Sequence, residues 1–259
     1  MAVNNLDIYF LGTCSGTEPL RGACHQSMAL KCGDSVYFFD AGENCSRTAH
    51  LCGIDLLAVR AVFISHTHMD HIGGLGNLLW NMRKLHYNCD YKDGVCKKTV
   101  FIPNISTYES FMNILRNTEE SFNILFELEG RQYKNGEIYR DENIKVTAFP
   151  TAHMGLNPVM SYCFLIECEG KRIVYSGDIA SLSELDDPIS DYCDALMCET
   201  GHVTPSAVCE YARTHNVKKL YFTHNNRRIV KNPAAYSNTV KNIFGNEAYI
   251  CTDGMKITL

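Results

Sequence analysis

The sequence has no hydrophobic run long enough to cross a membrane and no excess of positive charge. No stretch approaches roughly 18 unbroken apolar residues. The opening residues, MAVNNLDIYFLG, contain no basic segment followed by an apolar core and a cleavage site. We therefore expect a soluble, cytoplasmic protein without a membrane partner. The formal net charge of −5 provides no global positive field for nucleic acid, so long RNA or DNA partners are disfavoured.

The thirteen cysteines lack the spacing of a disulfide framework or a zinc ribbon. There is no C-x-x-C pair, and the closest cysteines, such as Cys163 and Cys168, are five residues apart. In the absence of a signal peptide, we expect reduced thiols that act as small buried apolar residues.

No internal repeat, low-complexity tract or Pro/Ser-rich linker divides the sequence. We therefore expect a single domain over residues 1–259. A hydrophobic fraction of 46% with 20% charged residues is ordinary for a globular protein, and this length is sufficient for a substantial core.

Segments rich in β-branched and aromatic residues predict strands, and helical patterns lie between them. An antiparallel meander is expected first, because Gly33 and Asp34 form a turn between two of its strands. Glu169 and Gly170 are expected to join a later hairpin. The expected strands cover 6–12, 27–32, 35–42, 56–65, 143–153, 161–168, 171–178 and 218–223.

Helical spacing of apolar residues predicts a helix over 73–85 and another over 106–126, the second capped by Ser106 or Thr107. A cap residue followed by proline marks two later helix starts, at Thr204 and at Asn232. The order of strands and helices predicts an α/β sandwich in which helices cover packed sheets.

The stretch FISHTHMDHIGGL (63–75) contains four metal-capable side chains within six residues, directly after an apolar strand pattern. His66 and His68 are two residues apart and are expected to project to one side of an extended segment, whereas Asp70 and His71 must point differently. That arrangement suits two metal ions held side by side, because imidazole favours zinc and a carboxylate can bridge two cations.

Three further metal-capable residues also follow strand patterns: His153 after VTAFPTA, Asp178 after RIVYSG and His224 after LYFT. Strand ends at one edge of a sheet are neighbours in space. We therefore expect these side chains to converge on the histidine cluster.

The motif SHTHMDHIGGL resembles the H-x-H-x-D-H signature of the metallo-β-lactamase superfamily, and TAHMG, YSGD and FTHNN continue the resemblance. LGTCSGTEP and DAGEN resemble segments of ribonuclease Z and its small phosphodiesterase relatives. The resemblance implies a four-layer αββα sandwich with two divalent metal ions, and it suggests a homodimer. It assigns His66, His68 and His153 to the first ion, Asp70, His71 and His224 to the second, and Asp178 to the bridge. Zinc is the favoured ion, although manganese and iron also suit these ligands.

The segment CETGHVTP resembles an interval in which ribonuclease Z-like proteins carry a glutamate and an H-x-T sequence. The resemblance implies that His202 protonates the leaving oxygen and that Glu199 orients His202, which suits a histidine whose pKa lies near neutral pH. The predicted catalytic residues are therefore Asp70, Glu199 and His202. The alternative is that Glu199 forms a strand-end salt bridge and His202 is an exposed cap residue.

Arg228 lies four residues after His224, where similar proteins often carry arginine. Its guanidinium is a candidate phosphate clamp through two parallel hydrogen bonds. Arg227 beside it leaves the assignment open, and both side chains could simply be solvated. Arg21 and His25, in the loop after GTCSGTEP, are weaker candidates.

Two features separate this sequence from the tRNA-processing enzymes that it resembles. HNNRR departs from their H-x-S-x-R-Y pattern at Asn226 and Ile229, and only 24 residues lie between His153 and Asp178, too few for a long tRNA-gripping arm. The segment from Trp80 to Lys98 is instead a candidate for the mouth of the pocket.

The sequence thus predicts a dinuclear metal-dependent hydrolase, with a small, cyclic or terminal phosphodiester as the preferred substrate and a metal-bridging hydroxide as the nucleophile. The alternatives are an acyl hydrolase (lactonase or thioesterase) on the same metals and a tRNA 3′ processing endonuclease. A di-iron oxidoreductase would usually carry glutamate at the position of His68. A purely binding module is equally disfavoured, because the set of ligands is complete.

Overall fold

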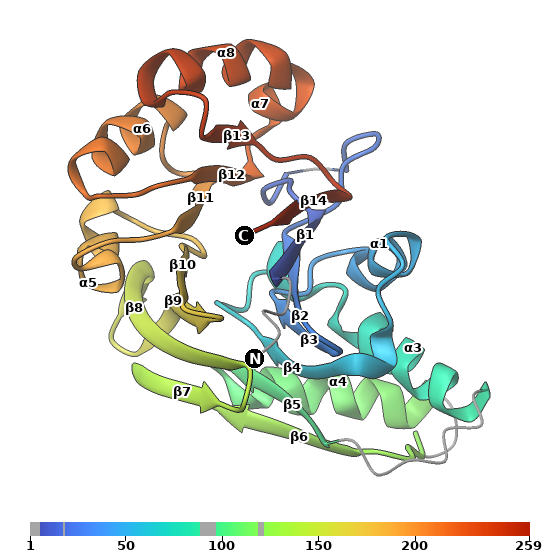
Figure 1. Cartoon of the computed structure of the whole chain (residues 1–259). Helices are drawn as coiled ribbons and strands as arrows, with labels where there is room; N and C mark the ends of the chain where they lie inside the picture. The colour runs from blue at the N-terminus through green and yellow to red at the C-terminus, as the bar shows by residue number, and fades with distance from the viewer. Residues whose placement is uncertain (1–5, 18, 89–96, 119–121) are drawn as a thin grey trace.

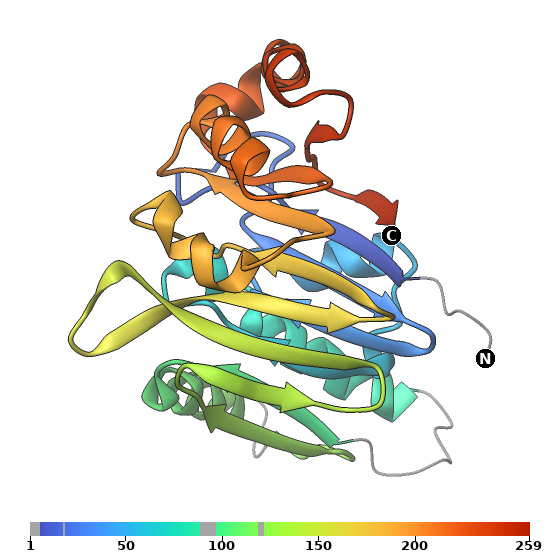
Figure 2. The ribbon, with the colours of Figure 1, turned by 60° about the vertical axis from the view of Figure 1, so that its left-hand side comes forward.

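The computed structural model describes residues 6–17, 19–88, 97–118 and 122–259. Two seven-stranded sheets face each other, with helices on their outer sides (Figures 1 and 2). The first sheet has the order β14-β1-β2-β3-β4-β5-β6, and the second has the order β13-β12-β11-β10-β9-β8-β7. This arrangement confirms the predicted αββα sandwich.

The strands of the first sheet are β1 (Leu6–Gly12), β2 (Ser27–Cys32), β3 (Ser35–Phe39), β4 (Val59–Phe63), β5 (Lys97–Ile102), β6 (Glu127–Gln132) and β14 (Met255–Thr258). Those of the second are β7 (Gly136–Arg140), β8 (Ile144–Leu156), β9 (Val159–Cys168), β10 (Lys171–Tyr175), β11 (Ala195–Thr200), β12 (Leu220–Asn225) and β13 (Ala248–Ile250). The opening strands β1 to β3 pair antiparallel, as predicted.

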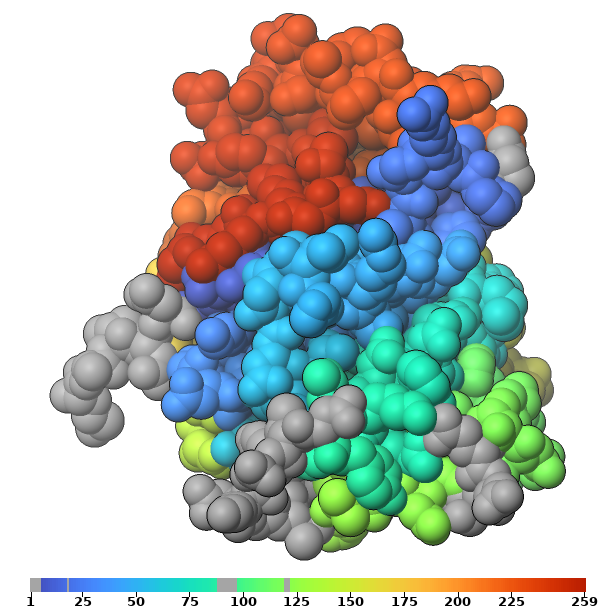
Figure 3. All heavy atoms as spheres, turned by 90° about the vertical axis from the view of Figure 1, so that its right-hand side faces the viewer, coloured from blue at the N-terminus to red at the C-terminus, as the bar shows by residue number. Residues whose placement is uncertain are grey.

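The helices form the two outer layers. Along the first sheet lie α1 (Cys45–Leu51), the short α2 (Met69–Ile72), α3 (Leu75–Asn88) and α4 (Ile105–Thr118). Along the second lie α5 (Asp186–Ile189), α6 (Pro205–Thr214), α7 (Arg227–Lys231) and α8 (Pro233–Phe244). Figure 3 shows the first of these faces, where α1, α3 and α4 form one continuous surface.

Alternation along the strands divides the apolar residues between the layers. In β1, Ile8 and Phe10 point between the sheets, whereas Leu11 joins the cluster under α1 and α3. Aromatic rings fill the space between the sheets: Phe63 stacks on Phe39 and on Phe101, with ring centroids 5.1 and 5.0 Å apart. The sheets are thereby fixed to each other, and the strand ends at one edge form a rigid base for the site.

The second predicted helix differs from the structure at both ends. The helix begins at Ile105, and Asn104 acts as the capping residue, because its Oδ1 accepts a hydrogen bond from the Ser106 backbone N–H (3.1 Å). The helix is described to Thr118, and residues 122–126, which the prediction included, are not helical. Phe122 adopts a positive φ of 43°, and its ring joins the apolar cluster without a helical backbone. Apolar spacing alone therefore overstated the helix.

The remaining caps follow the predictions in part. The Thr204 hydroxyl accepts a hydrogen bond from the Ala207 N–H, with Pro205 in the first turn of α6. Pro233 likewise begins α8, but the Asn232 side chain makes no capping hydrogen bond. The predicted strand over 56–65 begins with a short 3-10 turn at Leu56–Ala58 before β4.

Lys97 and Lys98, at the end of the predicted Trp80–Lys98 segment, lie away from the histidine cluster. Strand β5 runs parallel to β4, and its first residues lie at the start of β4, opposite the histidine cluster. Lys98 donates hydrogen bonds from Nζ to the carbonyl oxygens of Leu57 (2.7 Å) and Val59 (2.8 Å). Residues 89–96 lie outside the described residues.

All eleven cysteines in the described part of the chain are free, and all but Cys24 and Cys52 are buried. Burial raises the pKa of the Cys45 thiol to about 12. The prediction of free, buried thiols therefore holds for nine of these eleven cysteines, while Cys24 and Cys52 are partly exposed. Cys89 and Cys96 lie outside the described ranges. Among the described residues, no helix is both long and apolar enough to span a membrane.

Asp141 connects the two sheets. Its Oδ2 accepts hydrogen bonds from the hydroxyls of Tyr37 on β3 (2.6 Å) and Tyr139 on β7 (2.8 Å), and its Oδ1 accepts from the N–H groups of Asn143 and Ile144. Burial raises the pKa of Asp141, but the hydrogen bond from Tyr37 and the backbone N–H groups outweigh it, so the pKa lies below its ordinary value.

We expect Asp141→Ala to lower the free energy of unfolding at pH 7 by about 2–3 kcal/mol, because a charged acceptor is lost. A depressed pKa in the folded state stabilises the protein above the unfolded-state pKa of about 4, and this contribution disappears as the pH falls through the folded-state value. Denaturant unfolding at pH 7 and near pH 3 should therefore show a smaller difference between variant and wild type in acid. Asp191→Ala, at an exposed position, is the control; an equal loss at both pH values would contradict the prediction.

Candidate metal centre

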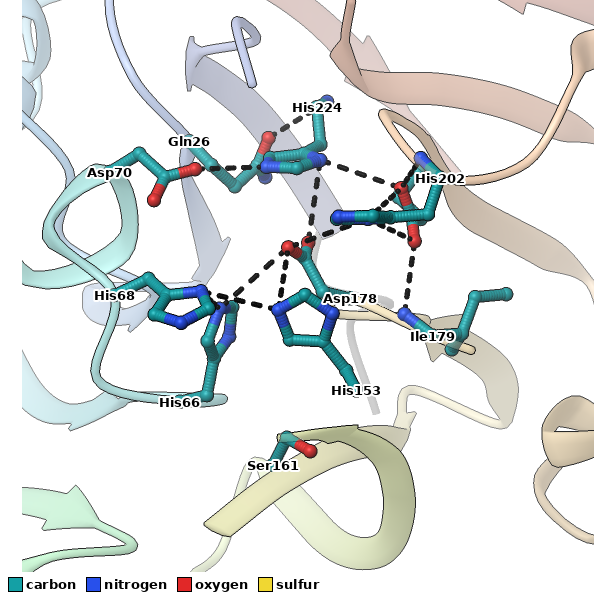
Figure 4. Close-up of polar contacts among 12 residues, drawn as sticks. Gln26, His66, His68, Asp70, His153, Ser161, Asp178, Ile179, His202 and His224 are labelled. Carbon is teal, nitrogen blue, oxygen red and sulfur yellow. Dashed lines mark hydrogen bonds and ion pairs between the residues drawn. The ribbon is translucent and has the colours of Figure 1, made fainter. Parts of the chain in front are cut away.

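The predicted ligands converge at one edge of the sandwich, where strands of both sheets end (Figure 4). The loop after β4 supplies residues 66–71, with Asp70 and His71 in α2. His153 lies within β8, Asp178 follows β10 and His224 lies near the end of β12. The structure thus brings together all seven residues that the sequence predicted as ligands.

Four ring and carboxylate atoms surround the first of two adjacent positions. His68 Nδ1 lies 3.1 Å from His66 Nε2 and 3.2 Å from His153 Nε2. Asp178 Oδ2 completes the group, at 3.7 Å from His66 Nε2 and 3.6 Å from His153 Nε2. These are the residues that the family resemblance assigned to the first ion, together with the aspartate that it assigned to the bridge.

The second position is surrounded by Asp70, His71 and His224. Asp70 Oδ2 lies 3.0 Å from His224 Nε2 and 3.4 Å from His71 Nε2. The other oxygen of Asp178, Oδ1, lies 3.3 Å from His71 Nε2. One carboxylate therefore faces both groups, with a different oxygen toward each, as a bridging ligand would.

Several of these atoms are buried without a hydrogen-bond partner, namely His71 Nε2, Asp178 Oδ1 and His224 Nδ1. An unsatisfied buried polar atom is costly, and burying several together is rare unless something else occupies the site. Imidazole nitrogens and carboxylate oxygens at this spacing are the ligands that zinc and similar divalent ions prefer. The residues present therefore fit a metal centre.

The carboxylates of the cluster are held in their ionised form. Burial raises the pKa of Asp70, but the hydrogen bond from His224 and the neighbouring imidazole of His71 outweigh it, and the pKa lies below its ordinary value. Burial is likewise outweighed at Asp178, where His224 and His71 lower the pKa. Burial, together with His71 beside it, lowers the pKa of His66. Burial lowers the pKa of His224, but Asp178 raises it, and the resulting pKa is about 9. Because a metal ligand must be deprotonated, an ion that binds His224 would displace a proton.

Asp40, at the end of β3, supports the cluster from behind. It is fully buried and accepts hydrogen bonds from His71 Nδ1 (2.7 Å), the Ser65 N–H (2.7 Å) and the Tyr175 hydroxyl (2.5 Å). Because a carboxylate only accepts hydrogen bonds, His71 carries its proton on Nδ1 and turns Nε2 toward the site. Asp40 lies in the DAGEN segment, but no local pattern indicated this contact.

Glu184 was also missed from the sequence. Its carboxylate accepts hydrogen bonds from the backbone N–H of Ala152 (2.8 Å), beside His153, and from that of Ala180 (3.0 Å), two residues after Asp178. It therefore fixes the backbone next to two of the predicted ligands. Only the fold brings these segments together, since 32 positions separate Glu184 from Ala152.

Glu199 and His202 are in contact beside the cluster. His202 Nδ1 lies 3.0 Å from both carboxylate oxygens of Glu199, and the His202 backbone N–H donates to Oε2 (2.8 Å). The hydrogen bond to Glu199 raises the pKa of His202. Glu199 is buried, whereas the His202 side chain is 43% exposed, and its Nδ1 lies 3.7 Å from Asp178 Oδ2. Thr204, and not His202, caps α6.

The side chains of Arg227 and Arg228 are both exposed on α7. The two residues that depart from the tRNA-processing pattern have structural positions: the Asn226 side chain caps α7, and Ile229 is buried. His25 Nε2 lies 3.3 Å from the Thr17 carbonyl oxygen. A second contact of His25, an ion pair with Glu43, spans 3.6 Å.

The αββα fold and the histidine and aspartate cluster define a metal-dependent hydrolase of the metallo-β-lactamase superfamily, of the ribonuclease Z-like kind. Within this class, residues 6–226 match the family described as anti-Pycsar protein Apyc1, and the chain belongs to that family.

Individual relatives and solved structures agree with the broader ribonuclease Z-like class. Ribonuclease Z of Archaeoglobus fulgidus is 24% identical over an alignment 300 positions long. The alignment covers 92% of this chain and 93% of the relative. The metallo-β-lactamase fold protein YhfI from Bacillus subtilis superposes with a TM-score of 0.77 at 17% identity, covering 98% of this chain and 100% of YhfI. The short form of human tRNase Z gives a TM-score of 0.73 at 19% identity, with 97% of each chain covered. At these identities the two structures show a shared fold.

Proposed function

We propose that the protein is a phosphodiesterase that acts on a small, cyclic or terminal phosphodiester with two divalent metal ions, zinc being the favoured metal. The observation that carries the proposal is the contact between His202 and Glu199 beside the cluster. A phosphodiester with an alkyl leaving group expels an alkoxide, which needs a proton as it departs. A thioester expels a thiolate, which leaves without one. A positioned acid is therefore expected in a phosphodiesterase.

The two groups of side chains are the proposed ligands. His66, His68 and His153 would hold the first ion and Asp70, His71 and His224 the second, while Asp178 faces both groups. Divalent cations bound there would neutralise charge on the phosphoryl oxygens. They would also lower the pKa of coordinated water to near neutrality. Asp40 fixes the tautomer of His71, and Glu184 fixes the backbone beside His153 and Asp178.

His202 is assigned as the proton donor to the leaving oxygen. Because the Glu199 carboxylate accepts from Nδ1, the protonated ring keeps a second proton on Nε2. Figure 4 shows the His202 ring directed toward Asp178, at the centre of the site. Glu199 also accepts a hydrogen bond from the Ile179 N–H (3.0 Å), so the acid and the bridging aspartate are positioned by one carboxylate.

Arg228 is the proposed phosphate contact. We expect Arg228→Ala to raise the KM for a phosphodiester by about 10-fold with kcat little changed, since a charge-assisted hydrogen bond of about 1.5 kcal/mol is lost from bound substrate. Steady-state kinetics of Arg228→Ala and of the neighbouring Arg227→Ala provide a matched pair. If only Arg227→Ala raises the KM, the clamp belongs to Arg227.

Processing of tRNA 3′ ends is a second candidate, because the ribonuclease Z relative matches nearly the whole chain. Two observations favour the smaller substrate. The net charge is −5, and residues 154–177 are taken up by the end of β8, by β9 and by β10, so no arm extends between His153 and Asp178.

The test is hydrolysis of bis(p-nitrophenyl) phosphate by the purified protein with added zinc, with added manganese and with chelator, alongside an acyl thioester. Metal-dependent cleavage of the diester without cleavage of the thioester supports the proposal. Cyclic nucleotides and a precursor tRNA are then compared as substrates. Cleavage of the thioester alone would replace the proposal with an acyl hydrolase, and a strong preference for the precursor tRNA would replace it with 3′ processing.

A further inference from the structure

We propose that Gln26 is a positioning residue that sets the affinity of the second metal ion by holding His224. The inference rests on the two-metal assignment proposed above. It does not depend on which bond the enzyme cleaves. Gln26 lies directly before β2 in the first sheet, whereas His224 belongs to β12 in the second sheet, so the contact between them crosses the sandwich.

His224 occupies an irregular position in its strand. Glu199 on β11 pairs with Thr223, and the next residue, Thr200, pairs with Asn225, so the register skips His224. Its φ is +47°, in the left-handed region that residues other than glycine rarely adopt. Such a bulge redirects a side chain out of the strand, but it leaves a backbone N–H without a partner in the sheet.

Gln26 supplies the missing partner. Its Oε1 accepts hydrogen bonds from the His224 backbone N–H (3.0 Å) and from the Thr223 hydroxyl (2.7 Å), as Figure 4 shows for His224. Gln26 is itself fully buried, and its main-chain carbonyl oxygen accepts a hydrogen bond from the Gly42 N–H (3.0 Å). The backbone that carries the Gln26 side chain is therefore anchored independently of His224.

The consequence concerns the second ion. In the bulged conformation, His224 Nε2 lies 3.0 Å from Asp70 Oδ2. Without Gln26 Oε1, a buried N–H loses its partner, which is costly, and the strained backbone is free to relax toward a regular strand. That relaxation turns the imidazole away from Asp70. The first group, His66, His68 and His153, has no hydrogen bond to Gln26 among the contacts described.

The test is stepwise zinc binding to the full-length protein in competition with a chromophoric chelator, with total metal measured by mass spectrometry. We expect wild type to bind two ions. We expect Gln26→Met, which keeps the length of the side chain but removes the acceptor, to bind the first ion like wild type and the second about 10–100-fold more weakly. Gln26→Asn, which retains the amide but withdraws it by one methylene, should weaken the second ion in the same direction.

Tyr37→Phe is the matched control, because it removes a hydrogen bond between the sheets, to Asp141, outside the metal site. It should lower the unfolding temperature and leave both affinities unchanged. The inference fails if Gln26→Met binds both ions like wild type, or if it weakens both equally, as a general loss of stability would. A wild-type protein that binds one ion would instead refute the two-metal assignment, and the role of Gln26 with it.

Discussion

Replacing Asp178 with alanine is expected to abolish hydrolysis and to reduce metal content to one ion or none. Its two carboxylate oxygens face different ligand groups, Oδ2 toward His66 and His153 and Oδ1 toward His71. The substitution removes the negative charge shared by the two positions and leaves several histidines around an empty space. We expect kcat to fall by at least about 10³-fold, the scale of loss when a group that stabilises transition-state charge is removed.

The measurement combines total metal per chain after dialysis with kcat on bis(p-nitrophenyl) phosphate. Asp187→Ala is the control, because it makes the same substitution at an exposed position on α5. It should match wild type in metal content and in kcat. A variant at Asp178 that keeps two ions and most of its activity would show that the carboxylate does not bridge.

The predicted ligands could be found from the sequence because each follows a strand pattern, and strand ends at one edge of a sheet meet in space. His66, His68, Asp70 and His71 are also close in sequence, so their clustering is visible without a structure. The fold was predictable for a related reason. Strand alternation and turn residues such as Gly33 and Glu169 act locally, and local patterns survive in the folded chain.

The supporting residues could not be found in this way. Gln26 lies 198 positions from His224, and Asp40 lies 31 positions from His71, so no local pattern links either pair. Their chemistry is also unremarkable in sequence, because a glutamine before a strand or an aspartate after one is ordinary at a sheet edge. The predicted start of α4 was wrong for a different reason. Asn104 and Ser106 are both suitable capping residues, and only the backbone geometry decides between them.

His202→Ala is expected to lower kcat by about 10²–10⁴-fold on a diester with an alkyl leaving group, the usual contribution of a general acid. The loss should be less than about 10-fold on bis(p-nitrophenyl) phosphate, whose leaving group is stable as an anion and needs little help from an acid. Metal content should match wild type, since His202 hydrogen-bonds to Glu199 and is not among the seven predicted ligands. A Glu199 variant is a poorer test, because Glu199 also accepts from the Ile179 N–H beside Asp178.

The control is His215→Ala, which removes another histidine paired with a carboxylate, Asp186 at 3.5 Å, at the end of α6 and outside the site. It should leave kcat on both substrates unchanged. The dependence on the leaving group separates the acid role from a structural one, because a distorted site would slow both substrates alike. Equal losses on the two diesters would therefore remove His202 as the proton donor, and the contact with Glu199 would then serve only to hold the loop between β11 and α6.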